Sequence, residues 1–350
     1  MNHSKGPRQL SWQRVSLSIL CVILALVLFV MLFATVYVHH LLGLITGGDN
    51  SMYETMSPEE LATATEAPPD GTITGPWVDH TDVDVKPLPS VPVGSLKTEG
   101  IINIMLIGED RRPGQGRQRS DSMILCSFNT KNNTITMISF LRDTYISKIP
   151  GYWADKLNAA YAYGGIKTMD QTFAAYFGVH IDAHVAVQFD GFKGIIDMLG
   201  GVDIELTAKE AKHMNTLGPW VVRAGMNHLN GEQALAYSRI RKIDMDAKRA
   251  ERQRKVLTAL INAYKNKSVP EMLTLASDIL GTGFIQTDMS SGEVLDYVTT
   301  LFPMLASATI NSQQIPAEGT YTNMNVGNVS ATKVADLETN RKILQQILGK

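Results

Sequence analysis

Cysteine is scarce in this sequence, and its scarcity excludes one class of protein. The 350 residues include two cysteines, Cys21 and Cys126, and each stands inside a separate apolar run. A scaffold held together by disulfides is excluded, because it needs several cysteines that can pair. No CxxC pair and no grouping of cysteine with histidine indicates a zinc site.

Sequence motifs of several well-known catalytic centres are also missing. There is no GxSxG, no P-loop pattern and no HExxH, so no nucleophile or metal centre of these kinds is indicated. The histidines have structural explanations, since His180 and His184 flank or occupy a predicted strand and His228 lies in a loop. We therefore assign them no catalytic role.

A strong net charge is lacking as well. The formal net charge is -2, which gives no sign of a nucleic-acid partner. The charges are unevenly distributed: residues 47–95 carry nine acidic residues and one lysine, whereas 28 basic and 25 acidic residues follow from Lys97 onward. The part predicted to fold is thus slightly basic, and the segment before it is acidic.

Charge is absent from the run Val15–Val38. At ~1.5 Å per residue in a helix, this run covers the ~30 Å hydrocarbon core of a bilayer. The apolar core of a cleavable signal peptide is shorter, about 7–15 residues, so we expect an uncleaved single-pass anchor. Lys5, Arg8 and Arg14 precede the run, and the positive-inside rule puts the N-terminus in the cytoplasm and the remainder outside the cell membrane.

The segment after this run has the composition of a spacer. Residues 46–95 are rich in Pro, Gly, Thr and acidic residues and poor in periodic apolar residues, which predicts a mostly disordered tether. The predicted segments are a cytoplasmic tail (1–14), a transmembrane anchor (15–38), an extracytoplasmic linker (39–97) and a catalytic domain (98–350).

Strand and helix patterns alternate in the predicted domain. A helical stretch is interrupted at Gly164–Gly165, and Asn230 with Gln233 resembles a capping box. This alternation predicts an α/β fold whose mixed sheet is covered on both faces. The first strands, read from apolar runs between turn residues, are Ile102–Gly108, Ser122–Phe128 and Thr134–Phe140.

The loop between the first two strands carries charge of both signs. Its sequence, GEDRRPGQGRQRSDSMI, holds four arginines together with Asp110 and Asp121. If consecutive strands pair antiparallel, Asp110, Asp121 and Arg142 lie at one end of the sheet. Charge of this kind can serve solubility alone, but carboxylates in a locally cationic loop are also the composition expected of a site for a metal ion and a polyanion.

A second charged cluster, DMDAKRAERQRKVLTALINAY, predicts a helix capped by Asp246. Its inward face, positions 249, 253, 256, 260 and 264, is cationic in the first turn and apolar later. Arginines at a helix N-terminus are unfavourable, and Arg249 lies on this stripe with Arg252 beside it. An anion bound at this helix end would compensate the positive charges of the two arginines. The alternative is that both side chains are solvated. Arg239 and Arg241 precede the helix and, if extended, point the same way.

Together, these stretches resemble the LytR-CpsA-Psr family of membrane-anchored phosphotransferases of bacterial cell walls. The resemblance is strong over residues 98–266 and implies an α/β/α sandwich with a groove for a polyprenyl lipid. Leu141 departs from the usual proline, and Arg254 from a common glutamine. The matching stretches are NIMLIGED with RSDSMIL, SFLRDTYI, DKLNAAYAYGG, FDGFKGIIDMLGGVDIEL, LNGEQALAYSRIRK and DMDAKRAERQRK.

The resemblance also implies roles for individual residues. Asp110 and Asp121 would hold Mg²⁺, or alternatively Mn²⁺. Arg142, Arg241 and Asp143 would be catalytic, and the general base is left open among the three aspartates. The residues that would cradle a pyrophosphate are Arg112, Arg119, Arg142, Lys156, Arg239, Arg241 and Arg249, with Gln253 nearby.

The implied chemistry is phosphoryl transfer from a lipid carrier. A peptidoglycan hydroxyl attacks the phosphorus joined to a glycopolymer, such as teichoic acid or capsule, and polyprenyl phosphate leaves. Positioning and charge neutralisation dominate such catalysis, and the planar fork of arginine suits phosphate oxygens. Two alternatives stay open: a hydrolase of the same lipid with water as acceptor, and a non-catalytic lipid-binding regulator.

Overall fold

The computed structural model describes residues 52, 96–109, 117–265, 267–326 and 329–349, which all belong to one compact unit, Thr46–Lys350. The predicted anchor, Val15–Val38, lies outside these residues. Within them, no helix is both long enough and apolar enough to cross a bilayer.

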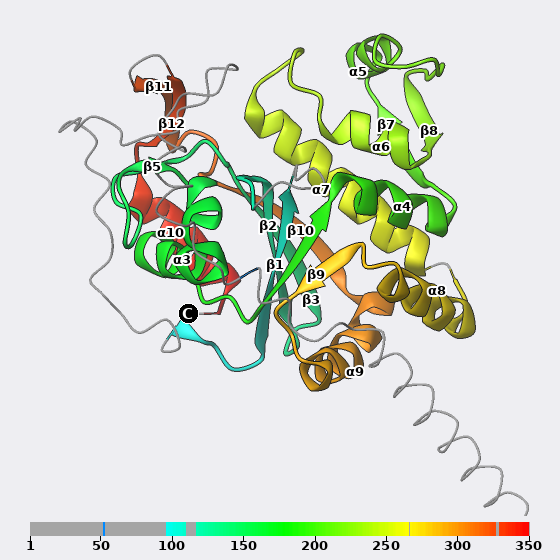
Figure 1. Ribbon diagram of the computed structural model, residues 1–350, viewed down its shortest axis with the longest axis horizontal. Coiled ribbons are helices and arrows are strands. Elements are labelled where there is room, and N and C mark those ends of the chain that lie inside the picture. The colour runs from blue at the N-terminus through cyan, green and yellow to red at the C-terminus, as the bar shows by residue number, and fades with distance from the viewer. Residues whose placement is uncertain (1–51, 53–95, 110–116, 266, 327–328, 350) are drawn as a thin grey trace, which may run out of the picture. The chain divides into compact units, whose positions relative to one another are not determined.

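A six-stranded mixed sheet forms the centre of this unit (Figure 1). Its first three strands pair antiparallel in sequence order, as predicted. β6 then pairs parallel with β1, and β10 pairs parallel with β3, so the sheet is mixed. The strand order is β10 (Thr309–Ile315), β3 (Thr134–Phe140), β2 (Ser120–Asn129), β1 (Ile101–Glu109), β6 (Ala183–Gln188) and β9 (Ile285–Thr287).

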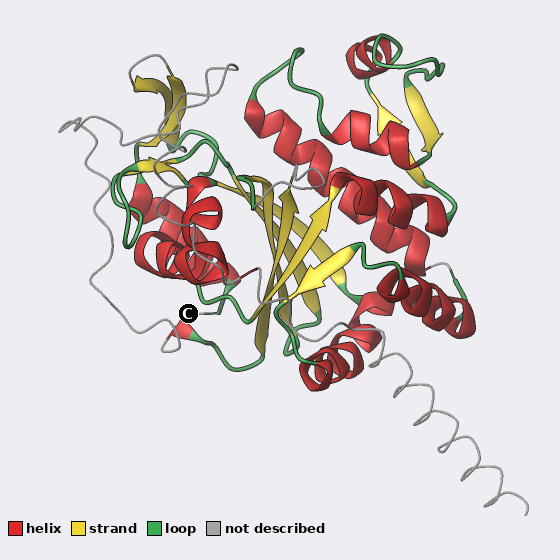
Figure 2. Cartoon of the chain, viewed as in Figure 1, coloured by secondary structure: helices red, strands yellow, loops and turns green. Residues whose placement is uncertain are grey.

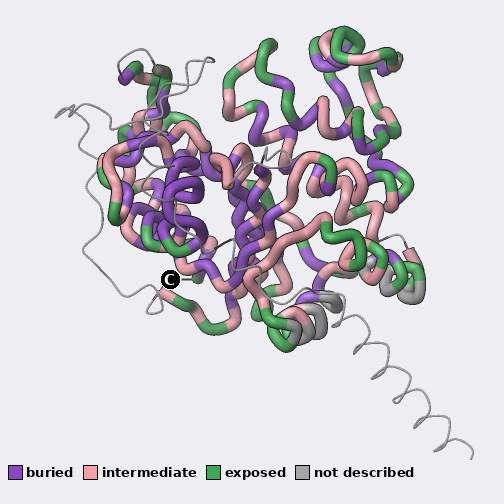
Figure 3. Tube along the Cα trace, in the orientation of Figure 1, coloured by how far each residue is buried: buried purple, intermediate pink, exposed green. Residues whose placement is uncertain are grey.

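Helices cover both faces of the sheet (Figures 1 and 2). Helices α3 (Ala159–Phe177) and α10 (Leu337–Ile347) lie on one face, and α7 (Asp246–Lys265) and α9 (Ser291–Ser307) lie on the other. This arrangement confirms the predicted α/β class with a mixed, doubly covered sheet. The largest buried region lies between the sheet and α3 (Figure 3).

Strand β1 shows how the sequence produces two covered faces. Its residues alternate between buried and half-buried along the strand, because successive side chains point to opposite faces. Met105 and Ile107 join the core under α3, whereas Leu106 packs on the α7 side with Leu257. One strand therefore supplies both the main core and the opposite face, where the cavity described below lies.

The predicted break at Gly164–Gly165 is confirmed as a kink inside α3. Gly165 has φ +63°, a conformation that side chains with a Cβ rarely adopt. A Cβ at this position would also lie 2.2 Å from the carbonyl oxygen of Met52. The side chain of Met52 is buried in the core under α3, so the kink makes room for a residue far away in the sequence.

A smaller subdomain packs beside α7 around its own core, which includes Ile204, Leu229 and Tyr237. The predicted capping box of Asn230 and Gln233 is confirmed at the start of α6. The subdomain comprises α4 (Phe189–Leu199), β7 (Val202–Leu206), α5 (Ala208–Met214), β8 (Gly225–Leu229) and α6 (Gly231–Ser238). The remaining elements are α8 (Val269–Gly281) and two strand pairs, β4 (Tyr145–Ile146) with β5 (Asp155–Lys156) and β11 (Tyr321–Val326) with β12 (Val329–Val334).

A buried histidine connects α3 and the segment after β9 to the sheet. His184, on β6, has one ring nitrogen 2.9 Å from Asp170 and the other 2.9 Å from Asp288. Burial alone would lower the pKa of its imidazole, but the two carboxylates outweigh burial and raise the pKa from 6.5 to about 9. The histidine is therefore charged in the folded protein at neutral pH.

The free energy of unfolding should fall by about 1–3 kcal/mol as the pH is raised from about 6.5 to about 9. The folded-state pKa of His184 is raised, so its stabilisation is complete below the unfolded pKa and is lost as the pH rises through the folded pKa. Urea unfolding at a series of pH values should show this slope in the wild type and lose it in His184→Gln. The carboxylate of Asp203 also raises the pKa of the exposed His228, so His228→Gln should lose only a smaller part of the slope; equal slopes in wild type and His184→Gln would contradict the assignment.

Candidate functional site

A cavity of about 590 Å³ lies between the sheet and the helices α4, α6 and α7. Most of its wall is apolar. Leu106 and Ile124 come from the sheet, Ile195 from α4, and Leu257 and Leu260 from α7. Residues of the chain after residue 278 complete the apolar wall: Ile279, Leu280, Ile285 and Val294.

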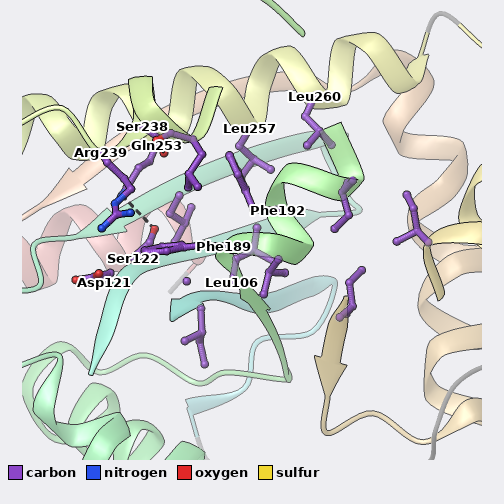
Figure 4. A pocket seen from close by; sticks show the side chains of 18 of the residues that line it. Leu106, Asp121, Ser122, Phe189, Phe192, Ser238, Arg239, Gln253, Leu257 and Leu260 are labelled. Carbon is purple, nitrogen blue, oxygen red and sulfur yellow. Dashed lines mark hydrogen bonds between the residues drawn. The ribbon is translucent and has the colours of Figure 1, made fainter. Parts of the chain in front are cut away.

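One end of this cavity is polar (Figure 4). Ser122 lies there on β2, and its hydroxyl donates to Oε1 of Gln253 over 3.1 Å. Gln253 lies on the stripe of α7 that was predicted to face inward, one turn before the apolar Leu257 and two turns before Leu260. The polar residues that line this end are Asp121, Ser122, Ser238, Arg239, Arg241, Arg249 and Gln253.

A network of ion pairs adjoins the polar end. Arg142, which follows β3, pairs with the carboxylate of Asp121 at the start of β2. Its Nε also lies 3.7 Å from Asp143 and 4.0 Å from Asp246. Arg249 pairs with Asp246 over 2.8 Å and donates to the carbonyl oxygen of Asp121 over 3.5 Å. The prediction that Asp121 and Arg142 meet at one end of the sheet is confirmed.

The charges in this network are crowded. Burial lowers the pKa of Arg249, and the nearby Arg142 lowers it further. Burial likewise raises the pKa of Asp246, and the carboxylates of Asp143 and Asp121 add to the rise, which the arginines only partly offset. Guanidiniums lie close to one another here, and so do carboxylates. The site therefore suits an anion beside the guanidiniums and a cation beside the carboxylates.

Two predicted cationic residues lie in a neighbouring network. Lys156 pairs with Asp143 over 2.8 Å, and burial of Asp143 is outweighed by Arg142 and Lys156, which hold its pKa below the usual range. Arg119 forms two hydrogen bonds to the fully buried Asp155, at 2.8 and 3.2 Å. Arg119 does not line the cavity among the described residues.

The structure corrects the prediction that was made for Arg252. Its charge was predicted to need an external anion, but the structure compensates it internally. Its Nε donates to Glu210 of α5 over 2.7 Å, and its terminal nitrogens pair with Asp244. The buried arginine of the first turns that does lie at the cavity is Arg249, with 5% of its surface exposed.

Of the two predicted metal ligands, only Asp121 lies among the described residues. Asp110 and the predicted pyrophosphate ligand Arg112 lie outside the described residues. In the described part of the chain, no three Asp, Glu, His or Cys residues are grouped closely enough to hold a metal. Asp121, a carboxylate at the cavity, has the donor chemistry that Mg²⁺ prefers.

Asp246, which the sequence predicts only as a helix cap, belongs to the site. The structure places it as the first residue of α7, paired with Arg249 three positions later. That spacing brings side chains together on one face of a helix, so the pairing was open to prediction.

An apolar cavity that ends in clustered arginines defines a protein that binds an amphipathic anion, with an apolar tail and a phosphate-type head. Comparison with known proteins agrees with this class. The chain belongs to the LytR_cpsA_psr family, whose family model matches residues 74–343.

Several relatives and solved structures are similar to this chain. A polyisoprenyl-teichoic acid–peptidoglycan teichoic acid transferase TagU from Bacillus cereus is 34% identical over 224 residues, which are 62% of this chain and 69% of the relative. The structure of TagT bound to LI-WTA covers 79% of this chain and 99% of its own, with a TM-score of 0.60 and 28% identity. A TagT structure with bound octaprenyl pyrophosphate lipid has a TM-score of 0.56 at 26% identity, with the same coverage.

Proposed function

We propose that this protein is a membrane-anchored phosphotransferase that moves a glycopolymer from a polyprenyl-pyrophosphate carrier to a hydroxyl of peptidoglycan. One observation carries the proposal: the apolar cavity accommodates a lipid tail, and the arginines at its end suit a pyrophosphate. Membership of the family and similarity to proteins named teichoic acid transferases support the same reaction. Those names make teichoic acid the first glycopolymer to test.

The reaction forms one bond to phosphorus and breaks another. The acceptor oxygen bonds to the phosphorus that carries the glycopolymer, the bond from this phosphorus to polyprenyl phosphate breaks, and the hydroxyl proton passes to a base. Arg239, Arg241 and Arg249 would neutralise the oxygens of the leaving phosphate. The carboxylates within reach of Arg142, those of Asp121, Asp143 and Asp246, are the described candidates for this base.

A divalent cation, Mg²⁺ or Mn²⁺, belongs to the proposal. Asp121 would hold it together with Asp110. Once bound, such a cation draws charge from phosphate oxygens and helps the leaving phosphate depart. Asp121 already pairs with Arg142, so the same carboxylate would orient the arginine and contact the metal.

The proposed location follows from the sequence. The uncharged run Val15–Val38 would anchor the chain in the cell membrane, with the catalytic domain outside the cytoplasm. Protease added to intact protoplasts should then remove the domain, and its protection would refute this orientation.

One experiment tests the function and separates it from its alternatives. The full chain in detergent is incubated with a synthetic polyprenyl-pyrophosphoryl glycopolymer and Mg²⁺, with and without peptidoglycan fragments. A transferase attaches the labelled glycopolymer to peptidoglycan. Release of free glycopolymer phosphate at an equal rate without acceptor would instead identify a hydrolase, and binding without turnover would identify a lipid-binding regulator.

The variant Ile195→Asp should weaken binding of a polyprenyl pyrophosphate by roughly tenfold or more. Ile195 lines the apolar wall from α4, and a carboxylate there must lose water when the lipid tail enters. Binding of inorganic pyrophosphate, which has no tail, should change little. Ile195→Leu keeps the wall apolar and serves as the control; equal losses for both ligands in Ile195→Asp would place the lipid elsewhere.

A further inference from the structure

The apolar part of the cavity is completed by a segment that comes late in the chain. Ile279 and Leu280 of α8 and Ile285 of β9 line this part of the wall. In Figure 1, α8 lies beside α4, and α4 contributes Ile195 to the same wall. The shape of this part of the cavity therefore depends on how the segment from α8 to β9 is held against α4.

The register of the sheet shows how far this segment lies from the polar end of the cavity. Ser122, at the polar end, pairs with Gly108 across β2 and β1. Gly108 pairs with Val187 of β6, which pairs in turn with Ile285 of β9. Neighbouring strands lie ~4.8 Å apart, so these three steps put Ile285 roughly 14 Å from Ser122. A lipid tail that starts at the arginines reaches Ile285 only if the tail is long.

Phe284 lies between α8 and β9 and packs closely against α4. A Cβ atom at Gly194 would lie 2.2 Å from a ring carbon of Phe284, and one at Gly191 would lie 2.7 Å from its carbonyl oxygen. Residues three apart in a helix lie on one face, so Gly191 and Gly194 together form a glycine notch that receives Phe284. A side chain at either position would collide with Phe284, and the close contact therefore requires glycine.

The glycine notch is a close contact beside open space. A second cavity, of about 330 Å³, lies between α4 and α8 and is lined by residues that include Met198 and Leu275. The turn that joins α8 to Phe284 is open as well, because a Cβ at Gly281 or Gly283 would have no atom within 4 Å. This space leaves α8 room to move, and Phe284 is placed to hold the segment against α4.

We propose that Phe284 is a positioning residue that holds the apolar wall closed around the far part of a long polyprenyl tail. Phe284 itself is not part of the cavity wall in the described chain, so it acts through Ile285, the next residue, and through Ile279 and Leu280. The proposal rests on the proposed function and deepens it, because it assigns the recognition of tail length to this contact. The alternative is that Phe284 supports the fold alone.

The variant Phe284→Ala removes the ring from the glycine notch. With the full chain in nanodiscs, its affinity for octaprenyl pyrophosphate should fall roughly tenfold, the loss expected for contacts with about two methylene groups. Its affinity for geranyl pyrophosphate, whose short tail leaves the β9 side of the cavity empty, should stay unchanged. If Phe284 supports the fold alone, the folded variant binds both ligands as the wild type does.

The variant Gly194→Ala tests the same contact from α4. Its methyl group takes the place of the ring, so it should weaken octaprenyl pyrophosphate to a similar extent and leave geranyl pyrophosphate unchanged. The double variant with Phe284→Ala should lose no more than either single variant, because both remove one contact. Gly292→Ala is the matched control: this glycine lies in α9, where no atom would be within 4 Å of the added Cβ, so both ligands should bind as in the wild type.

Thermal melts show which variants fold, and Phe284→Leu replaces Phe284→Ala if the latter does not fold. Equal losses for the two ligands, losses that add independently in the double variant, or unchanged affinity for octaprenyl pyrophosphate would overturn the proposal. A wild type that does not bind octaprenyl pyrophosphate would refute the proposed function and this inference together. A wild type that binds it beside folded variants that bind it equally well would refute this inference alone.

Discussion

The variant Arg249→Ala is expected to lower kcat for glycopolymer transfer by roughly 10²- to 10³-fold, the effect of removing one preorganised charge-stabilising donor. Arg249 is 5% exposed and lies at the polar end of the cavity. An ion pair with Asp246 holds its guanidinium in position before the substrate binds. No reorganisation is therefore needed when charge develops on the leaving phosphate. Transfer of labelled glycopolymer to peptidoglycan fragments measures the loss.

The neighbouring Lys248 provides a matched control for this loss. Its side chain is 62% exposed and pairs with Glu251, so Lys248→Ala should keep transfer within about twofold of the wild type, as expected for a surface ion pair. Arg249→Lys keeps the charge without the planar fork and should fall between the two. An Arg249→Ala variant that folds and retains transfer within tenfold would remove Arg249 from the proposed mechanism.

The variant Asp121→Asn is expected to lose transfer by roughly 10²-fold or more together with stabilisation by Mg²⁺. Its carboxylate lies at the cavity and pairs with Arg142, and the amide keeps the shape without the charge that attracts a cation. Without metal, the variant should melt near the wild-type temperature. Thermal melts across a Mg²⁺ series, run beside the transfer assay, measure both effects.

A structural role for Asp121 predicts the opposite pattern. Arg119, two residues before Asp121, pairs with Asp155, whereas the arginine paired with Asp121 is Arg142. If that pair mainly supports the fold, the variant melts lower without metal and still responds to Mg²⁺. Asp244→Asn removes another arginine-paired aspartate, away from the cavity wall, and should show this second pattern.

The parts of the fold that local patterns specify were predictable. The strands β1 to β3 consist of apolar runs bounded by turns, and β1 alternates strictly in burial, so their order and pairing followed from the sequence. The edge strand β10 was not predicted. Its sequence, TINSQQI, is mostly polar, and its one buried residue is Ile315 at the end. What defines the strand is a parallel register with β3, from Thr134 with Thr309 onward.

The site was predictable where short-range geometry decides contacts. Asp121 and Arg142 meet because antiparallel neighbours bring their ends together. The partners of Arg119 and Arg252 were missed because Asp155 and Glu210 lie 36 and 42 residues away in the sequence. Nothing in the local pattern distinguishes an arginine that meets a distant carboxylate from one that awaits an anion.

The residues that carry the chemistry are not enough to complete the sheet, because β9 and β10 lie after them in the sequence. The family motifs end by residue 266, yet the strands at both edges of the sheet come from residues 285–287 and 309–315. Until those residues are available, β3 and β6 are open edges that invite pairing with other chains, and the pairing of β3 with β10 closes a loop of well over a hundred residues. Residues 285–315 thus cover both edges of a sheet whose site residues come from earlier in the chain, and a chain cut before residue 285 would leave both edges unpaired.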